Sequence, residues 1–376
     1  MTIQNLVFSG GGAAGCAFGG AIMGLAEQPN FSFADIKVVA GSSVGAIAAL
    51  IVSLNYTPVQ ASAKIEQLNL QKLRDGGPKL SQAYRLMNHY GRFKGNALFH
   101  FILDILAEKT NRDDPENITF ADLKKMGFKD LHVVTTKLYK ENGNPIGKEK
   151  IFSYAKTPDT SVASAILAST AAPIYFARVR FKKLAKGKYI LDKKGDLYND
   201  GGILNNYPIN LFDKPPFTDA PGTPNAQTLG LALLYADEIH KEEKPVKTII
   251  YDKSPIDYAK GIINGLLRKQ QIESVTRKEN LERTIQIDRL NVRLDNFDIG
   301  DEIKQQLIIS GRKAVSDYFK TYHLETKKLN NIVALPPKFS LFRYFKPAND
   351  PVFGYEEKTE KEIKEEKLSA SQMGLD

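Results

Sequence analysis

The sequence predicts an α/β fold with a mostly parallel central sheet, and two strand–turn–helix units near its amino terminus carry this prediction. In the first, an apolar run over residues 3–8 enters a glycine-rich turn, and a helix follows to about Glu27. In the second, an apolar run at 38–40 that begins with two β-branched residues leads into Gly-x-Ser-x-Gly over 41–45 and then into small and aliphatic residues. Short apolar strands that alternate with helices are typical of parallel sheets covered on both faces.

The later elements continue this alternation. The segment 86–106, rich in Met, Tyr and Phe, has two interpretations: a helical hairpin packed on the sheet, or a mobile amphipathic cover over an acyl-binding cleft. Loop residues with four prolines are predicted at 213–227. The other segments are strands at 130–136, 229–235 and 283–288, a hairpin-like turn at 140–150, and helices at 58–73, 160–172, 258–282 and 301–322.

The composition predicts a globular protein without a disulfide framework. The chain has 376 residues, of which 42% are hydrophobic, enough for a large core. The single cysteine, Cys16, cannot form an internal disulfide and suits a reducing compartment. The apolar helix after Ser43 is too short to cross a bilayer, and residues 1–5 lack the pattern of a secretory signal. We therefore expect a cytoplasmic or peripheral membrane location.

The net charge of +9 indicates an anionic partner. Basic residues are spread along the chain among acidic ones, without an arginine-rich run or a recognisable nucleic-acid motif. This distribution favours a phospholipid membrane surface as the partner, and no nucleic acid.

A core over residues 1–325 and a carboxyl-terminal tail over 326–376 are expected. In the tail, 338–346 interleaves aromatic with basic residues, and 356–367 is rich in Glu and Lys. The first stretch fits docking either on a lipid interface or on the protein's own core. The second fits a solvated helix or a disordered segment.

Ser43 is the candidate nucleophile, because it stands at the centre of the Gly-x-Ser-x-Gly turn. The flanking glycines permit the strained backbone that lifts a serine out of the sheet. A serine nucleophile needs a base and fixed donors for the oxyanion. The glycine-rich turn that contains Gly10, Gly11 and Gly12 opens a helix, so its free N–H groups can supply these donors.

Asp200 is the candidate base. It follows an extended segment and precedes two glycines, which let the carboxylate stand at a loop edge, although an ordinary Asp-Gly turn fits the same residues. None of the five histidines falls in a triad motif, so a Ser-Asp dyad is the economical proposal. An aspartate is a poor base near neutral pH, so burial would have to raise its pKa.

The first glycine-rich turn also fits a dinucleotide fingerprint, Gly10-x-Gly12-x-x-Gly15, with Asp35 farther along the chain. The acidic residue that binds a ribose belongs at the end of the second strand, however, and Asp35 precedes that strand. A nucleotide-binding enzyme is therefore the weaker alternative.

Four motifs in order resemble the patatin-like phospholipases. They are the glycine-rich turn at 10–15, Gly-x-Ser-x-Gly at 41–45, Ala-Ser-Thr-Ala-Ala-Pro at 168–173, and Asp-Gly-Gly followed by Asn206 and Pro208 at 200–208. The resemblance covers about residues 3–325. It implies a three-layer α/β/α fold and a lipid acyl hydrolase of the phospholipase A or lysophospholipase type, acting through an acyl-enzyme without a metal or other cofactor.

Carried over to this chain, the resemblance makes Ser43 the nucleophile and Asp200 the base. Gly11 and Gly12, with Gly10, would hold the oxyanion. Substrate-cleft candidates follow from the sequence itself, since a proline ends the predicted helix at 160–172 and aromatic residues follow it: Pro173, Tyr175 and Phe176.

One position departs from the family pattern. Ala14 stands where the family usually has Arg or Lys, which puts headgroup preference and catalytic efficiency in doubt. A catalytically weak or inactive membrane or protein adaptor therefore stays open as an alternative. The family includes bacterial enzymes that enter host cells without a cleavable signal peptide and are activated by a host protein, so the resemblance also implies secretion and a host activator as expectations.

Overall fold

The computed structural model describes residues 2–68, 71–184, 188–240 and 254–331. By its contacts the chain divides into two units, Met1–Glu325 and Thr326–Asp376. The aromatic and basic stretch at 338–346 and the Glu/Lys run at 356–367 lie outside the described residues.

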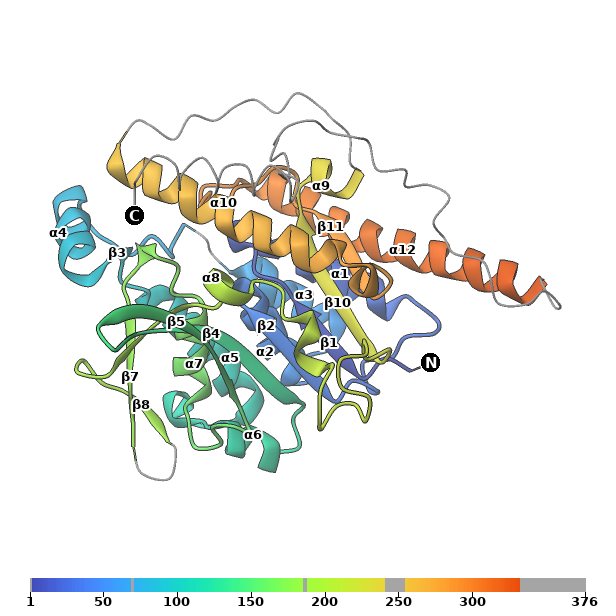
Figure 1. Cartoon of the computed structure of the whole chain (residues 1–376), viewed down its shortest axis with the longest axis horizontal. Helices are drawn as coiled ribbons and strands as arrows, with labels where there is room; N and C mark the ends of the chain where they lie inside the picture. The colour runs from blue at the N-terminus through green and yellow to red at the C-terminus, as the bar shows by residue number, and fades with distance from the viewer. Residues whose placement is uncertain (1, 69–70, 185–187, 241–253, 332–376) are drawn as a thin grey trace, which may run out of the picture. The chain divides into compact units, whose positions relative to one another are not determined.

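Nine strands of the described chain form one sheet, and five of them are mutually parallel (Figure 1). The parallel strands lie in the order β11 (Thr284–Asp288), β10 (Thr228–Leu234), β1 (Asn5–Phe8), β2 (Val38–Ser42) and β4 (Asp130–Glu141). The antiparallel strands β5 (Asn144–Ser153) and β9 (Asp196–Asp200) both pair with β4, and β7 (Val179–Lys183) and β8 (Tyr189–Leu191) continue the sheet beyond β9.

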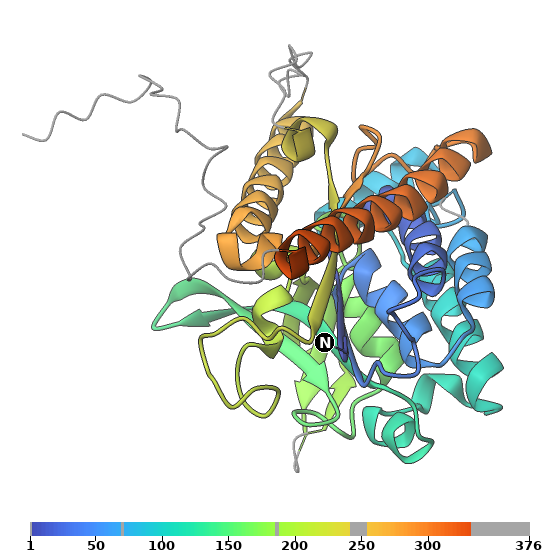
Figure 2. The same cartoon turned by 90° about the vertical axis from the view of Figure 1, so that its right-hand side faces the viewer.

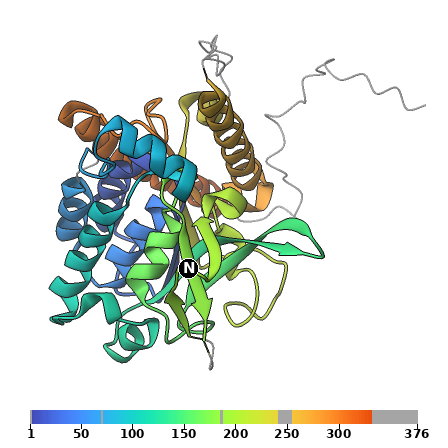
Figure 3. The same ribbon diagram turned by 90° about the vertical axis from the view of Figure 1, so that its left-hand side faces the viewer.

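Helices cover both faces of the sheet, which confirms the predicted three-layer α/β/α fold. Leu6 and Phe8 of β1 point into one hydrophobic core, and Val7 between them points into the other. Figures 2 and 3 show α10 on one side of the sheet and the blue and green helices on the other. The larger core contains residues of α1 (Ala17–Ala26), α2 (Val44–Ser53), α3 (Pro58–Gln67), α5 (Asn96–Thr110), α6 (Phe120–Lys125), α7 (Val162–Ser169) and α12 (Asp301–Asn331).

The opposite face carries fewer helices. Its core includes Val275 from α10 (Pro255–Thr276) and a cluster at 207–212 that contains a short 3-10 helix. Other short elements are α8 (Gly202–Asn205), α9 (Ala236–His240), α11 (Lys278–Leu281), 3-10 helices at Gly12–Cys16 and Pro115–Asn117, and a separate two-stranded sheet of β3 (Gly91–Phe93) and β6 (Ile174–Phe176).

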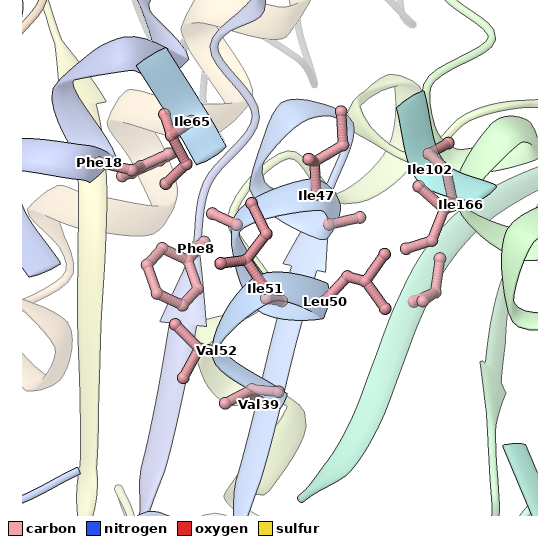
Figure 4. Close-up of a cluster of buried hydrophobic side chains, with 14 of the residues drawn as sticks. Phe8, Phe18, Val39, Ile47, Leu50, Ile51, Val52, Ile65, Ile102 and Ile166 are labelled. Carbon is pink, nitrogen blue, oxygen red and sulfur yellow. The ribbon is translucent and has the colours of Figure 1, made fainter. Parts of the chain in front are cut away.

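Helix α2, which directly follows Ser43, lies at the centre of the larger core. Ile47, Leu50 and Ile51 pack among side chains from the sheet and from neighbouring helices (Figure 4). A helix that is apolar on all sides belongs in a core or a membrane, and here the core explains the pattern. Among the residues described, no helix combines the length and apolar character needed to cross a bilayer.

The segment 86–106, interpreted either as a helical hairpin packed on the sheet or as an amphipathic cover over a cleft, has two unlike halves. Helix α4 (Lys79–His89) ends early, β3 follows, and α5 begins at Asn96. Leu98 and Ile102 of α5 are buried in the larger core, whereas α4 has no buried residue. Two helices are therefore present, but the short strand β3, which begins at Gly91 and pairs with β6, separates them, and only the second helix packs in the larger core.

The predicted turn at 140–150 is the end of a longer hairpin. All of β5 pairs with β4, from His132 to Glu141, around a turn in which Asn142 and Gly143 have positive φ angles. The outer part of this hairpin is rich in lysine and exposed, so the apolar pattern that predicted a strand at 130–136 stops before the strand does.

Candidate active site

Ser43 occupies a sharp turn between β2 and α2. Its backbone has φ 55° and ψ −129°, a region that residues with a side chain rarely adopt. The turn requires glycine on both sides: a Cβ on Gly41 would lie 2.2 Å from the Gly45 carbonyl oxygen, and one on Gly45 would lie 2.4 Å from the Ser9 carbonyl oxygen. The Ser43 N–H donates to Ser169 Oγ at 3.0 Å, which fixes the strained peptide from the side of α7.

Asp200 lies beside Ser43 because both flank the same strand. Along β4, Val134 is paired with Ser42 of β2, and the next residue, Thr135, is paired with Asp200 of β9. As a result the Ser43 hydroxyl donates to Asp200 Oδ2 at 2.7 Å. The other carboxylate oxygen, Oδ1, accepts the Gly202 N–H at 2.7 Å, so the carboxylate is held by two donors.

The Asp200 carboxyl is buried, and desolvation raises its pKa to about 6, although the hydrogen bonds from Ser43 and Gly202 oppose this rise. A carboxylate with a raised pKa is a better proton acceptor than a solvated aspartate. Proton transfer from Ser43 to Asp200 is thus supported by both geometry and electrostatics.

No histidine in the described part of the chain lines the pocket around Ser43. His132 lies in β4 and is buried against the rings of Phe212 and Phe217, which belong to or pack on the smaller core. Burial and the nearby Lys156 lower its pKa to about 4. His132 is therefore a neutral core residue.

The glycine-rich turn has three backbone N–H groups that are candidate oxyanion donors, and two of them have no hydrogen-bond acceptor within the described residues. The N–H of Gly10 donates to the Asn206 carbonyl at 2.8 Å, so the expectation that Gly10 contributes to the oxyanion hole is corrected. Gly11 and Gly12 line the same pocket as Ser43, and neither N–H has an acceptor within the described residues. Gly12 also has a φ of +56°, which favours glycine.

Arg289, which follows β11, contacts this turn and was not indicated by the sequence. Its guanidinium is buried, donates from Nη2 to the Gly11 carbonyl at 3.1 Å and from Nε to the Val292 carbonyl at 2.9 Å, and lies 4.6 Å from the centre of the Tyr235 ring. The C=O of Gly11 and the N–H of Gly12 belong to one trans peptide and point in opposite directions. Holding the carbonyl therefore orients the Gly12 N–H.

Asn206, from the fourth motif, ties the turn to α10. Its Nδ2 donates to Gln271 Oε1 at 2.6 Å, and its backbone N–H donates to Gln270 Oε1 at 2.8 Å. A Cβ on Gly10 would lie 2.1 Å from Asn206 Oδ1, so the turn and this amide are packed in direct contact. The two glutamines carry no sequence signal, since glutamine on a helix is ordinarily a solvated residue.

Ala14 lies buried in the larger core and carries no charge into the site. A cationic group does contact this turn, because the guanidinium of Arg289 donates to the Gly11 carbonyl. Arg289 is far from the turn in sequence, so this contact is visible only in the folded chain.

A largely apolar pocket opens in front of Ser43 and Asp200. Pro173, Tyr175 and Phe176, the cleft candidates, all lie in its wall, and the Tyr175 hydroxyl donates to Asp295 Oδ2 at 2.7 Å. Most of the remaining wall is aliphatic or aromatic, which suits a fatty acyl chain. The other apolar wall residues are Val44, Ile47, Leu68, Leu73, Leu98, Ala172, Ile203, Ile263, Leu267, Leu294 and Phe297.

Comparison with known proteins matches the chain to one family. The family model described as patatin-like phospholipase matches residues 6–213, which include Ser43 and Asp200. Protein R571 of Acanthamoeba polyphaga mimivirus is 26% identical over 81% of this chain and 89% of its own length. The probable lipid hydrolase 463L of Invertebrate iridescent virus 6 is 27% identical over 56% of this chain and 63% of its own length.

Among solved structures, VipD from Legionella pneumophila superposes with a TM-score of 0.50 at 17% identity, over 85% of this chain and 67% of VipD. At this identity the likeness concerns the fold alone. The match covers less than two thirds of the iridescent virus protein, so the activity in that protein's name does not carry over directly to this chain.

Proposed function

Because this chain belongs to the patatin-like phospholipase family, we propose that it is a lipid acyl hydrolase of the phospholipase A or lysophospholipase type, with a Ser43–Asp200 dyad. The observation that carries the proposal is the 2.7 Å hydrogen bond from the Ser43 hydroxyl to a buried carboxylate at the end of an apolar pocket. The proposal assigns the activity to residues 1–325 and the substrate to a phospholipid surface.

The first half of the reaction forms an acyl-enzyme. Ser43 Oγ attacks the ester carbonyl carbon while Asp200 accepts the hydroxyl proton. The N–H groups of Gly11 and Gly12 donate to the oxyanion of the tetrahedral intermediate. When the C–O bond of the ester breaks, the proton on Asp200 passes to the departing alcohol, which is a lysolipid when the substrate is a diacyl phospholipid.

The second half returns the free enzyme. A water molecule attacks the acyl carbonyl and gives its proton to Asp200, and the same N–H groups hold the second oxyanion. Collapse of this intermediate breaks the bond to Ser43 Oγ, which takes the proton back from Asp200. The fatty acid leaves, and the apolar wall around Tyr175 and Phe176 is where its chain would lie in both halves.

The experiment that tests the proposal is fatty acid release from mixed phospholipid vesicles as a function of pH. We expect kcat/KM to rise through pH 6 and then level, because Asp200, with its pKa raised to about 6, must be ionised to accept the proton. The measurement is made with and without eukaryotic cell extract, which tests for an activator. No release under any condition would favour the inactive adaptor, and a rate that rises only above pH 8 would exclude Asp200 as the base.

The proposal also assigns a positioning role to Arg289. Replacing it with Met keeps much of the packing but removes both hydrogen bonds, so the Gly12 N–H loses its fixed direction. We expect Arg289→Met to lower kcat about tenfold to a hundredfold with little change in KM, since an oxyanion donor acts mainly in the transition state. Arg289→Lys should recover part of kcat, because it keeps a donor.

The matched control is Arg283→Met. Arg283 is also a buried arginine, but it pairs with Asp213 at 2.6 Å, and neither residue lines the pocket. This control should lower thermal stability and leave kcat unchanged in the folded protein. If both variants lowered kcat to the same extent, the role of Arg289 would be structural only.

A further inference from the structure

We propose that the exposed apolar sides of α4 and α10 form a docking surface for an anionic phospholipid bilayer at the mouth of the pocket. We call this the rim surface, and it consists of Leu80, Tyr84, Met87, Tyr258, Ile262 and Leu266. The inference rests on the proposed function, because it places the bilayer that holds the substrate.

Helix α4 provides the strongest part of this surface. Leu80, Tyr84 and Met87 are spaced by four and three residues, so they lie on one side of the helix. Their exposed fractions are 86%, 64% and 73%. A surface helix normally buries its apolar side against the core, yet α4 buries none of its residues.

Helix α10 continues the surface from the wall of the pocket outward. Ile263 and Leu267 line the pocket, while their neighbours Ile262 and Leu266 are exposed by 47% and 64%. Tyr258, one turn earlier, is also exposed. Most of the large apolar side chains that are more than 60% exposed in the described chain lie on α4 and α10. The others are Val59 on α3 and Ile309 on α12.

Polar contacts connect both helices with β6, the strand that contributes Tyr175 and Phe176 to the pocket wall. The Tyr90 carbonyl, directly after α4, accepts the Ile174 N–H at 3.3 Å. Lys260 of α10 lies 3.8 Å from the Asp295 carboxylate, which also accepts the Tyr175 hydroxyl. Figures 1 and 3 show α4 and α10 at the same end of the sheet. The pocket is lined by Gly11 and Ser43, which follow the carboxyl ends of β1 and β2.

The charge around α4 favours an anionic bilayer as the occupant. The sequence has no acidic residue between Asp75 and Asp104, and the basic residues of this interval are Lys79, Arg85, Arg92 and Lys94. The Asp75 carboxylate is itself engaged by backbone N–H groups at the start of α5, from residues 94–97. An apolar stripe flanked by cations suits insertion among anionic lipid headgroups.

A bilayer also fits the position of the surface better than a protein partner does. A lipid substrate must pass from the bilayer into the pocket, and the shortest path for its acyl chain runs along continuous apolar surface. On α10 the pocket wall and the exposed side are formed by adjacent residues, so such a path exists at the rim surface.

The first test uses the absence of tryptophan from this chain. In the Ser43→Ala background, which keeps the lipid composition constant, Leu80→Trp and Leu266→Trp each introduce a single tryptophan, which is excited selectively over the tyrosines. With vesicles of phosphatidylcholine and phosphatidylserine in equal amounts, we expect a blue-shifted emission and quenching by lipids brominated in the acyl chain. Val59→Trp and Ile309→Trp should show neither. Unchanged emission at positions 80 and 266, or equal changes at all four positions, would overturn the proposal.

The second test separates the docking surface from the active site. The variant Leu80→Gln/Tyr84→Gln/Met87→Gln should release fatty acid from the same vesicles about tenfold more slowly, because interfacial affinity scales with the apolar area inserted. Hydrolysis of a monomeric, water-soluble short-chain ester should not change. Equal vesicle rates for this variant and the wild type would refute the inference. If neither protein hydrolysed any ester, the proposed function would fail, while the fluorescence test would still decide the docking.

Discussion

Ser43→Ala should abolish fatty acid release, with a fall in kcat of about 10⁴-fold or more, because no other nucleophile stands in its place. The hydroxyl is the donor to Asp200 Oδ2, and its removal leaves no atom that can form the acyl-enzyme. The fold should persist, since the Ser43 backbone, including its N–H bond to Ser169, is kept by alanine. The measurement is the initial rate on vesicles, together with the circular dichroism melt.

Ser42→Ala is the matched control. It removes a hydroxyl one residue away, whose oxygen is buried and has no hydrogen-bond partner among the described residues. We expect the control to keep the wild-type rate, because Ser42 does not line the pocket. Should Ser43→Ala retain turnover above the level of a mock preparation, Ser43 would have to be removed from the mechanism.

Asp200→Asn should lower kcat by about 10⁴-fold, since an amide has the shape of the carboxylate but cannot accept the proton of Ser43. Burial and the two hydrogen-bonded neighbours hold the side chain, so the loss should appear in kcat far more than in KM. The control is Asp196→Asn, at the other end of β9, where the carboxylate pairs with Lys137 near the surface. It should leave the rate unchanged.

The same variant should change the pH dependence of stability in a defined direction. In the wild type, the folded pKa of Asp200 is about 6, above the value of 3.8 for an unperturbed aspartate. The folded state therefore binds the proton more tightly, and stability falls as the pH rises through 6. This loss is on the order of 3 kcal/mol at most. The Asp200→Asn variant has no carboxyl to ionise and so does not lose this stability. Its melting temperature should therefore exceed that of the wild type at pH 8 and equal that of the wild type near pH 4. A lower melting temperature at pH 8 would contradict the raised pKa.

Local sequence patterns were sufficient for the parts of the fold that depend on near neighbours. The strand–turn–helix units around the glycine-rich turn and Ser43 follow from apolar runs and from glycines at positions where a Cβ would clash. The helix after Ser43 is apolar on every side, and this alone identifies it as buried. Such features can be predicted because each depends on a few consecutive residues.

Local patterns failed where pairing partners are distant. The strand β3 forms between α4 and α5 only because β6, about eighty residues later, offers it hydrogen bonds. The length of the β4–β5 hairpin is likewise hidden, because its outer half is charged and lacks the alternation of a half-buried strand. In both places the decisive contacts are made across the sheet.

The sequence by itself determined the class of fold, the two residues of the candidate dyad and the direction in which the Asp200 pKa would have to move. Only the tertiary structure decided which donors are free, since the Gly10 N–H is taken by Asn206 and the Gly11 carbonyl is held by Arg289. It also decided that the apolar side of α4 has no place in the core. The physical reason is that hydrogen-bond satisfaction and burial belong to pairs of atoms brought together by folding, whereas strand, turn and helix propensities belong to short stretches of chain.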